Sequence, residues 1–403
     1  MRKDKKKRIR NKKKRRESYS FTEVVFLSFM MALLGILVGI LLCYCKINIL
    51  DSSDAKLQEI VSTYNNIVNN SYSNIDKDEL ADSAISGMVN SLDDSYSNFL
   101  SEEETKTFNE SINGYYEGLG ITITKNDKGD TVIVDVAKNS PASKAGIKVD
   151  DIIVSIDNKD ANKTEIFDLS DYVSKSGNKY LNIKIRRDNK ILEYNIKRAK
   201  VVVQSVISEV NDNIGYLDIN NFALNTGKQF NKELDKLMEK NVKGLIIDLR
   251  DNPGGHLGQV KSMVEPFFKK NTVIYQIKGK HRSVKVRTSA KNKINIPVVI
   301  LINENSASAS EIVASCFKEN YKNVTLVGKM TYGKGTIQKE VKLSTGSSIK
   351  YTTQKWLTSK GVWLNHEKNK GLKPDVEVDV CKDEKCEKDM QFEKALEILK
   401  KSR

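Results

Sequence analysis

A run of 22 uncharged and almost entirely apolar residues, from Val24 to Cys45, constrains this chain more than any other feature. A run of this length is sufficient to cross a lipid bilayer once as a somewhat tilted helix. We therefore expect a transmembrane helix over residues 21–45, with a different environment for the chain on each side of it.

The charge of the chain is concentrated before that run. The sequence has 67 Lys and Arg and 52 Asp and Glu, a net charge of +15. Residues 2–16 hold 12 of the basic residues and one acid, Asp4, so this segment carries +11 and the remainder only about +4. Nucleic-acid binding has little support outside this tail. A basic flank before an apolar span predicts that residues 1–20 stay cytoplasmic. Everything after Lys46 is then expected across the membrane, on its extracytoplasmic side.

The apolar run is longer than the core of a typical signal peptide, and no A-x-A cleavage site follows it. The large residue Leu42 before Cys43 argues against a lipoprotein signal. These observations favour an uncleaved single-span anchor in the cell membrane, and they leave cleavage open.

Residues 46–112 have the pattern of amphipathic helices, with a start signal at Asp76 and Glu79. The two helices either pack together or pair with a second copy of the chain, so a homo-oligomer is an open alternative. Their apolar stripes are Leu57, Ile60, Val61, Tyr64, Ile67 and Val68, and Leu80, Ala84, Ile85, Met88, Val89 and Leu92.

A serine-rich turn follows a predicted buried strand in the second half of the chain. The apolar run 298–302 precedes Ser306-Ala307-Ser308-Ala309-Ser310-Glu311-Ile312, after which apolar residues recur at helical spacing. A serine between a strand and a helix start lies where backbone N–H groups and the helix dipole favour a developing oxyanion. This position suits acyl transfer.

A serine nucleophile needs a base, and the three histidines, His256, His281 and His366, lie in no recognisable triad motif. Lys334, between two glycines after the strand-like run 324–327, is the alternative. A lysine must be desolvated to act as a base near neutral pH. Gln338, four residues on, is placed to orient the amine through its side-chain carbonyl.

A glycine turn completes the set. The run 244–255, Gly-Leu-Ile-Ile-Asp-Leu-Arg-Asp-Asn-Pro-Gly-Gly, predicts a buried strand that ends in a turn with close backbone approach. Its N–H groups could join the oxyanion hole. We interpret His256, which follows the glycines, as a loop residue near the site.

These motifs together resemble the carboxy-terminal processing peptidases (tail-specific proteases), a family of serine peptidases with a Ser/Lys dyad and a PDZ domain. The resemblance runs from about Asp93 to Val378. It is carried by Leu92-Asp93-Asp94-Ser95-Tyr96-Ser97-Asn98-Phe99-Leu100, where the family usually has Pro at Ser95, by Gly118-Leu119-Gly120-Ile121, by the glycine, serine and lysine runs, and by Gly371-Leu372-Lys373-Pro374-Asp375.

The resemblance implies a role for each motif position. Ser308 would be the nucleophile, Lys334 the general base and Gln338 the residue that positions the lysine. The N–H groups of Gly254 and Ala309 would form the oxyanion hole. The dyad spacing of 26 residues is about one longer than expected, and we place the extra residue near 319–322.

Residues 113–200 resemble a PDZ domain. Gly118, Leu119, Gly120 and Ile121 would bind a peptide's terminal carboxylate through backbone N–H groups, with the peptide added as a β-strand. Strands are expected at 131–136, 152–156, 181–185 and 192–196, and a short helix at 140–147. Where such domains commonly have Gly-Asp, this chain has Asp150-Asp151.

The cysteines add one open question. Cys316 lies on the apolar face of the helix after the serine turn, where a buried thiol is the default. Cys381 and Cys386 either form a small disulfide or stay free, and no Cys/His set matches a zinc site.

The expected fold is mixed α/β: an α/β peptidase core with an inserted PDZ β-sandwich, N-terminal helices and one transmembrane helix. We expect a cytoplasmic tail (1–20), the span (21–45), a helical region (46–112), the PDZ domain (113–200), the peptidase core (201–379) and a C-terminal helical tail (380–403). The predicted activity is that of a membrane-anchored serine endopeptidase that captures protein C-terminal tails and needs no metal or cofactor. The PDZ domain could also gate the site. The alternatives are a catalytically inactive PDZ adaptor and a chaperone at the membrane.

Overall fold

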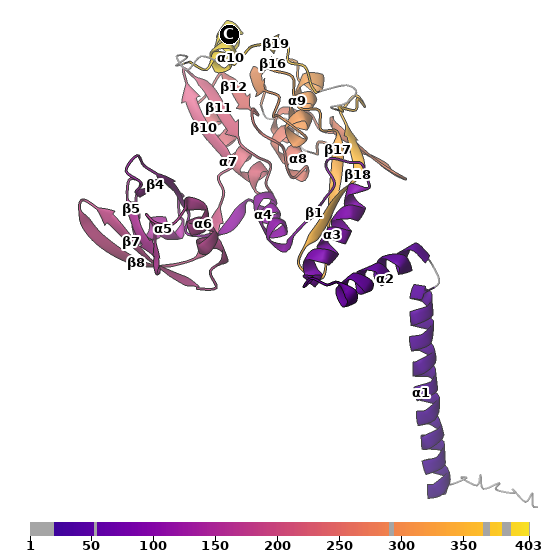
Figure 1. Cartoon of the computed structure of the whole chain (residues 1–403). Helices are drawn as coiled ribbons and strands as arrows, with labels where there is room; N and C mark the ends of the chain where they lie inside the picture. Colours follow the sequence, from indigo (N-terminus) through magenta and orange to yellow (C-terminus); the bar gives the residue numbers. More distant parts are fainter. Residues whose placement is uncertain (1–19, 52–54, 290–293, 366–370, 381–387, 403) are drawn as a thin grey trace, which may run out of the picture. The chain divides into compact units, whose positions relative to one another are not determined.

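The computed structural model describes residues 20–51, 55–289, 294–365, 371–380 and 388–402 (Figure 1). Most of the basic tail, His366, and Cys381 with Cys386 lie outside the described residues. The chain divides into two compact units, Met1–Ala84 and Ile85–Arg403.

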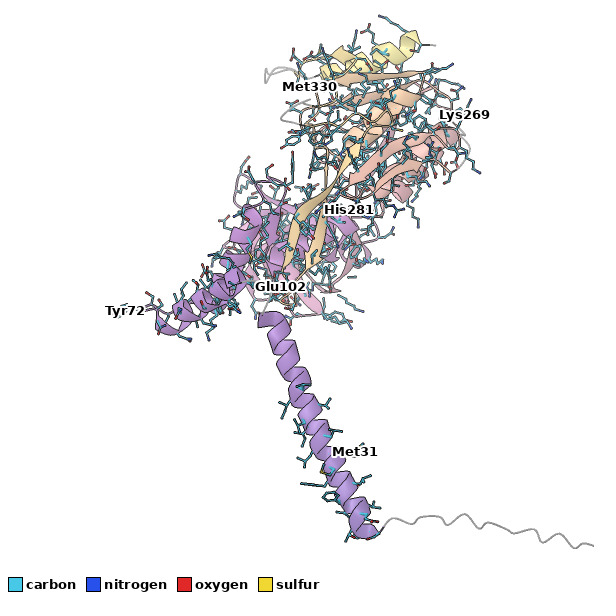
Figure 2. All side chains as sticks on the ribbon, turned by 90° about the vertical axis from the view of Figure 1, so that its right-hand side faces the viewer. Met31, Tyr72, Glu102, Lys269, His281 and Met330 are labelled. Atoms are coloured by element: carbon cyan, nitrogen blue, oxygen red, sulfur yellow. The ribbon has the colours of Figure 1, made fainter. Side chains whose placement is uncertain are left out.

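The first unit is helical. Helix α1 (Phe21–Asp51) contains a stretch, Phe21–Leu41, that is long and apolar enough to cross a membrane, although a signal sequence has the same properties. The large apolar side chains of the stretch Phe21–Leu41 are exposed, as Met31 illustrates in Figure 2. Helix α2 (Ala55–Asn70) follows and buries none of its residues.

Helix α3 (Lys77–Asn90) begins where the sequence predicts. The carboxylate of Asp76 accepts hydrogen bonds from the N–H groups of Asp78 (2.9 Å) and Glu79 (3.1 Å). These N–H groups have no partner within the helix, so the aspartate satisfies them as an N-cap.

Residues 115–202 form a small β domain around one sheet, with strand order β3-β4-β5-β7-β8 and β6 paired to β5. Strand β3 therefore lies at the edge of the sheet. A buried aliphatic cluster, which includes Ile133, Ile153 and Ile183, fills the space between the sheet and its helices. The elements are β2 (Tyr115–Gly118), β3 (Ile121–Lys125), β4 (Thr131–Val136), α5 (Pro141–Ala145), β5 (Ile152–Ile156), β6 (Lys159–Asp160), α6 (Ile166–Lys175), β7 (Tyr180–Arg187), β8 (Lys190–Lys197) and β9 (Ala199–Val202), where β2 pairs with β9.

The Asp150-Asp151 turn has an aspartate at the position where PDZ domains commonly have glycine. Asp150 has φ +70°, in the left-handed region that a glycine would occupy at no cost and that Asp tolerates. Asp151 is buried and accepts two 2.6 Å hydrogen bonds from Arg187. Although burial opposes ionisation, these bonds hold the pKa of Asp151 below its usual value.

The peptidase core is built on a six-stranded sheet in the order β10-β11-β12-β15-β16-β19. Strands β12 and β15 are buried along their whole length and pair in parallel, which confirms the two buried strands expected from their apolar runs. The strands are β10 (Val206–Asn211), β11 (Ile214–Ile219), β12 (Gly244–Asp248), β15 (Val298–Ile302), β16 (Val324–Gly328) and β19 (Val376–Glu377).

Helices cover both faces of this sheet (Figure 1). On one face α7 (Thr226–Glu239), α8 (Gly258–Val264) and α9 (Ala309–Asn320) bury Phe230, Val260 and Ile312 against it. On the other face α10 (Met390–Lys401), in the segment expected as a helical tail, packs through Leu396 and Leu399. The result is a three-layer αβα core.

A second sheet of the core is organised by its longest strand, β18 (Ser348–Leu357). This strand pairs in antiparallel fashion with β1 (Asn98–Leu100), β13 (Val273–Gly279) and β17 (Thr336–Lys342), and β13 pairs with β14 (Ser283–Arg287). Helix α4 (Glu102–Asn113) follows β1 and begins at a capping box on Ser101. Segments from the two ends of the chain thus share one sheet.

Candidate active site

Ser308 occupies the sharp turn between β15 and α9. It has φ +54° and ψ −111°, an unusual conformation for a residue other than glycine, and it is 8% exposed. The neighbouring hydroxyls are engaged in packing the turn: Ser306 Oγ donates to Leu249 O (2.7 Å) and Ser310 Oγ to Asn252 O (3.0 Å). Ser308 Oγ donates no hydrogen bond within the described part of the chain.

The buried carboxylate of Glu311 ties the serine turn to the lysine loop. Its Oε2 accepts from Ser308 N (2.8 Å) and from Lys334 N (2.9 Å). Its Oε1 accepts from Thr331 Oγ1 (2.6 Å) and Gly333 N (2.7 Å). One carboxylate oxygen therefore holds the backbone of both candidate dyad residues, although burial raises the pKa of Glu311.

Lys334 lies in a largely desolvated environment. Burial lowers its pKa, the positive charge of Lys350 lowers it further, and the carboxylates of Asp94 and Glu311 act in the opposite direction. Its Nζ is 4.9 Å from the centre of the Tyr96 ring. The Lys334 carbonyl accepts a 2.7 Å hydrogen bond from Trp356 Nε1, which fixes the loop to β18.

The dyad side chains are not hydrogen-bonded in this structure. Among the described residues, no hydrogen bond joins Ser308 Oγ to Lys334 Nζ. Gln338 does not contact the lysine amine by a hydrogen bond either, since its Nε2 donates to Thr336 Oγ1 (2.9 Å) and Thr352 Oγ1 (3.0 Å). Catalytic hydrogen bonds are often long in free enzymes and tighten only with substrate.

The glycine turn presses directly against the serine. A Cβ added at Gly254, which has φ +93°, would lie 2.7 Å from Ala307 O, 2.9 Å from Ala309 N and 2.9 Å from the Ser308 Cβ. The Gly254 N–H donates to Asn252 Oδ1 (2.9 Å), so it is already engaged. No hydrogen bond from Ala309 N–H is found within the described ranges, so this amide is the better available oxyanion donor.

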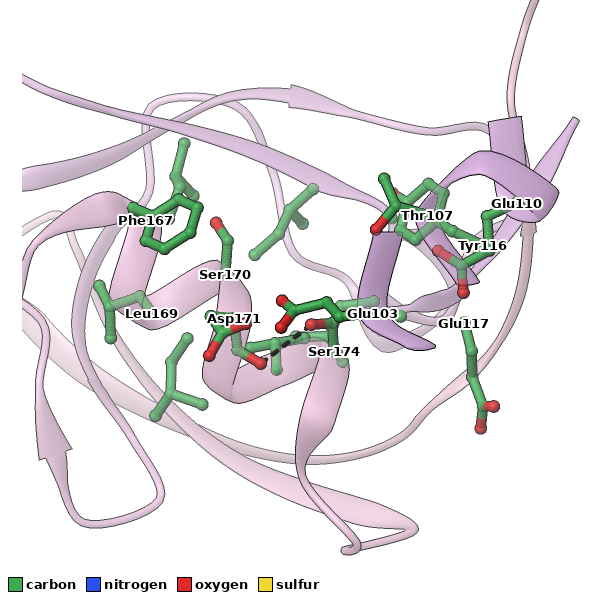
Figure 3. A pocket seen from close by; sticks show the side chains of 17 residues that line it. Glu103, Thr107, Glu110, Tyr116, Glu117, Phe167, Leu169, Ser170, Asp171 and Ser174 are labelled. Atoms are coloured by element: carbon green, nitrogen blue, oxygen red, sulfur yellow. Dashed lines mark hydrogen bonds between the residues drawn. The ribbon is translucent and has the colours of Figure 1, made fainter. Parts of the chain in front are cut away.

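The predicted peptide loop lines a groove with a volume of about 370 Å³ between the small β domain and helix α4, which contributes Glu103, Thr107 and Glu110 (Figure 3). Gly118, Leu119, Gly120 and Ile121 form one part of it, between edge strand β3 and helix α6. Phe167, on α6, is 77% exposed beside the groove. An apolar wall beside a free strand edge suits an extended peptide.

Several site residues were not found by sequence reasoning. Sequence reasoning assigns no role to Glu311, Tyr96 or Lys350. The only signal for Tyr96 was its place in the first motif of the family resemblance, and Lys350 has none.

Cys316 is fully buried, as expected, and burial raises the pKa of its thiol. Within the described residues, no group of three or more His, Cys, Asp or Glu side chains could hold a metal ion.

Three segments of the chain match known protein families. Residues 213–378 match peptidase family S41, residues 118–198 match the PDZ domain, and residues 46–105 match the N-terminal domain of the activating protease CtpB. Fold and site thus define a serine-type peptidase with a PDZ domain in its chain.

Relatives extend over most of the chain. The carboxy-terminal processing protease CtpA of Bacillus subtilis is 37% identical over 82% of this chain and 70% of its own length. A probable CtpA-like serine protease of Staphylococcus epidermidis is 34% identical over 88% of this chain and 74% of its own. The photosystem II D1 C-terminal processing protease has a solved structure that is 25% identical, covers 80% of this chain and 86% of its own, and has a TM-score of 0.46.

The chain therefore belongs to the carboxy-terminal processing proteases of peptidase family S41, as the resemblance predicted. It is a serine-type C-terminal processing peptidase, and an inactive adaptor or chaperone is not favoured.

Proposed function

We propose that this peptidase is anchored in the cell membrane by α1, with its N terminus in the cytoplasm and its catalytic part outside, and that it cleaves through a Ser308–Lys334 dyad. The observation that supports the dyad most directly concerns Glu311. One of its carboxylate oxygens, Oε2, accepts hydrogen bonds from both Ser308 N and Lys334 N. The lowered pKa of the partly buried lysine supports its role as a base.

The chemistry follows from these positions. A rotation of the Lys334 side chain would bring its neutral amine to Ser308 Oγ, which attacks the scissile carbonyl carbon as its proton passes to the lysine. Ala309 N–H would stabilise the oxyanion. Gly254 N–H would join it if its bond to Asn252 Oδ1 is exchanged for the substrate. Lys334 then protonates the leaving amine, and water hydrolyses the acyl-enzyme with the same base.

Substrate capture would use the groove between β3 and α6. The tail of a protein substrate would add to β3 as an antiparallel strand, and its terminal carboxylate would bind the N–H groups of the loop 118–121. The apolar wall, with Leu119, Ile121 and Leu169, supports an apolar terminal residue.

The test uses the full chain in detergent with an unfolded protein that ends in an apolar tail. We expect fragments from the wild type and none from Ser308→Ala. Lys334→Ala and Lys334→Arg should both abolish cleavage, because a guanidinium stays protonated. Lys228→Arg, on the exposed side of α7, is the matched control. Near-native turnover by Lys334→Arg would refute the dyad.

The tail requirement is tested separately. The same substrate with an amidated C terminus keeps its side chains but loses the carboxylate, so its KM should rise while Ser308-dependent cleavage remains. Equal KM values for both forms would contradict carboxylate recognition and leave the dyad untouched.

A further inference from the structure

A hollow of the peptidase core lies at the tip of the β13–β14 hairpin, where it reaches Gln338 of the candidate site. It has a volume of about 500 Å³ and is lined by the hairpin tip and by parts of β17 and β18. Gln338, which the family resemblance places next to the lysine base, is part of its lining. The lining residues with charged or titratable side chains are Lys280, His281, Arg282 and Lys339.

The charge of this hollow is one-sided. No Asp or Glu occurs in the sequence between Glu265 and Glu304, whereas the same segment holds nine Lys and Arg besides His281. Strand β18 also lacks acids, and the acid of β17, Glu340, accepts a 3.0 Å hydrogen bond from Asn109. Figure 2 labels His281 beside these strands.

The cations of the hairpin tip form no ion pair with a carboxylate in the part of the chain that the structure describes. Lys280, His281 and Arg282 are exposed. When the ion pairs of the described residues are ordered by their basic residue, Lys261–Glu265 is followed directly by Lys318–Asp375, so no described Lys or Arg between these two pairs is in an ion pair. No described carboxylate therefore neutralises the tip.

The register of the strands concentrates the charge further. Lys278 of β13 lies directly opposite Lys355 of β18. Like charges at directly opposed positions destabilise a sheet, so folding alone gives no reason for this pairing. The Lys355 Nζ is 3.6 Å from the centre of the Trp363 ring, which relieves only part of the cost.

We propose that this basic hollow binds acidic side chains of the substrate near the scissile bond, so that the enzyme prefers segments with Asp or Glu there. The inference rests on the proposed function, because it treats Gln338 as part of the cleavage site. Strand β17 pairs with β18 and with no other described strand, so its free edge offers backbone groups to an extended peptide. A peptide is thus favoured over a lipid surface as the occupant.

The test uses the full chain in detergent and a set of fluorescence-quenched peptides that share one apolar tail. Each peptide has a single Glu at a different position, and a peptide with Gln at the same position is its reference. We expect Glu at one or two positions to raise kcat/KM by about three- to ten-fold at low salt, and the gain to fade near 0.5 M salt because these charges are exposed.

Charge reversal at the hairpin tip provides the decisive comparison. Lys280→Glu/Arg282→Glu should prefer Lys over Glu at those positions, whereas Lys280→Arg/Arg282→Lys should keep the wild-type preference. Neither side chain takes part in the turn, which is closed by the 2.8 Å bond from Gly279 N to Arg282 O. Lys228→Glu/Lys240→Glu, on α7 and at its C-cap, outside the hollow, is the matched control.

Three results would overturn the proposal: no preference for Glu in the wild type, the same preference after charge reversal, or its loss in the charge-conserving variant. If reversal weakens binding to phosphatidylglycerol vesicles but leaves peptide selectivity unchanged, the surface is a membrane contact and the proposal is wrong. Failure of the proposed function looks different, since Ser308→Ala would then cleave as well as the wild type.

Discussion

In the proposed mechanism Lys334 must lose its proton before it can act as a base, so its pKa should set the acid limb of the activity profile. Activity should rise with pH through that pKa and level off below the usual range of lysine, because burial and Lys350 lower the value. Lys350→Met removes the second cause. We expect the acid limb of kcat/KM to move to higher pH and activity at pH 7 to fall.

Lys342→Met is the control for that profile, since Lys342 is exposed on the neighbouring strand β17 and does not shift the pKa of Lys334. An unchanged limb in Lys350→Met would mean that another group limits the reaction.

Glu311 is expected to matter for stability as well as turnover. Its replacement by Ala leaves four donors without their acceptor, and each buried donor costs about 1–3 kcal/mol. Some will find water, so we expect a loss of about 3–5 kcal/mol in the free energy of unfolding by denaturant titration, and a fall in kcat of about 100-fold.

Glu311→Gln separates the two effects, because it keeps one acceptor oxygen but turns an NH2 group toward two donors. Its stability should lie between wild type and Glu311→Ala, with kcat still low. Glu319→Gln, later on α9, should change kcat little. Wild-type kcat in Glu311→Gln would show that the clamp is dispensable.

The local surroundings of the serine turn could be predicted from the sequence, because an apolar run, a small-residue turn and helical spacing are neighbours in the chain. The Glu311 clamp could not. It depends on the approach of residues 331–334 to α9, and no local pattern encodes that contact. The same holds for Tyr96 and Lys350, which come to Lys334 from distant strands.

At the scale of elements, the contact between the glycine turn and the serine turn is sensitive to one methyl group. Gly254→Ala would push a Cβ to 2.7 Å from Ala307 O and strain a φ of +93°. We expect kcat to fall at least about 100-fold with a smaller change in KM, measured by steady-state kinetics.

Gly129→Ala is the matched control for that substitution, because Gly129 has φ +80° but nothing within 4 Å of an added Cβ. It carries the backbone strain without the crowding. If both variants lose kcat equally, the contact with Ser308 is not the cause.

The groove beside α6 makes a separate prediction. Phe167→Ser should raise KM for an apolar-tailed substrate by about five- to ten-fold and leave kcat and stability nearly unchanged, because this exposed ring contributes apolar area only when a tail is bound. Ile191→Ser, which is 58% exposed on β8 outside the groove, should leave KM unchanged. A change in KM for both would point to a general effect on the domain.

Most elements follow from local pattern, and the exceptions are informative. Strands 131–136 and 152–156 have the predicted bounds, because apolar alternation and turn residues delimit them. The pairing of β1 with β18, and the packing of α10 on the main sheet, depend on distant partners. Such pairings leave no periodic trace in the sequence.

For the whole molecule, the orientation in the membrane is the property to measure. If residues 1–20 are cytoplasmic, a reporter that functions only after export should be active when fused after Arg403, and a reporter that functions only in the cytoplasm should be silent there. Fusions ahead of residue 1 should give the opposite result. If the cytoplasmic reporter is active at Arg403, the catalytic part lies in the cytoplasm and the proposed orientation is wrong.

The pairing of β1 with β18 also has a temporal consequence. Thr105, just after β1, bonds through its hydroxyl to Ser348 of β18, 243 residues further along the chain. Contacts of such long range form late, because the intervening chain must be synthesised and its loop entropy overcome first. Tyr96, two residues before β1, lies beside the candidate base Lys334 and depends on this pairing for its position. In the proposed mechanism the candidate site is therefore incomplete until synthesis has passed β18, so we expect cleavage activity to appear only after this strand has been made.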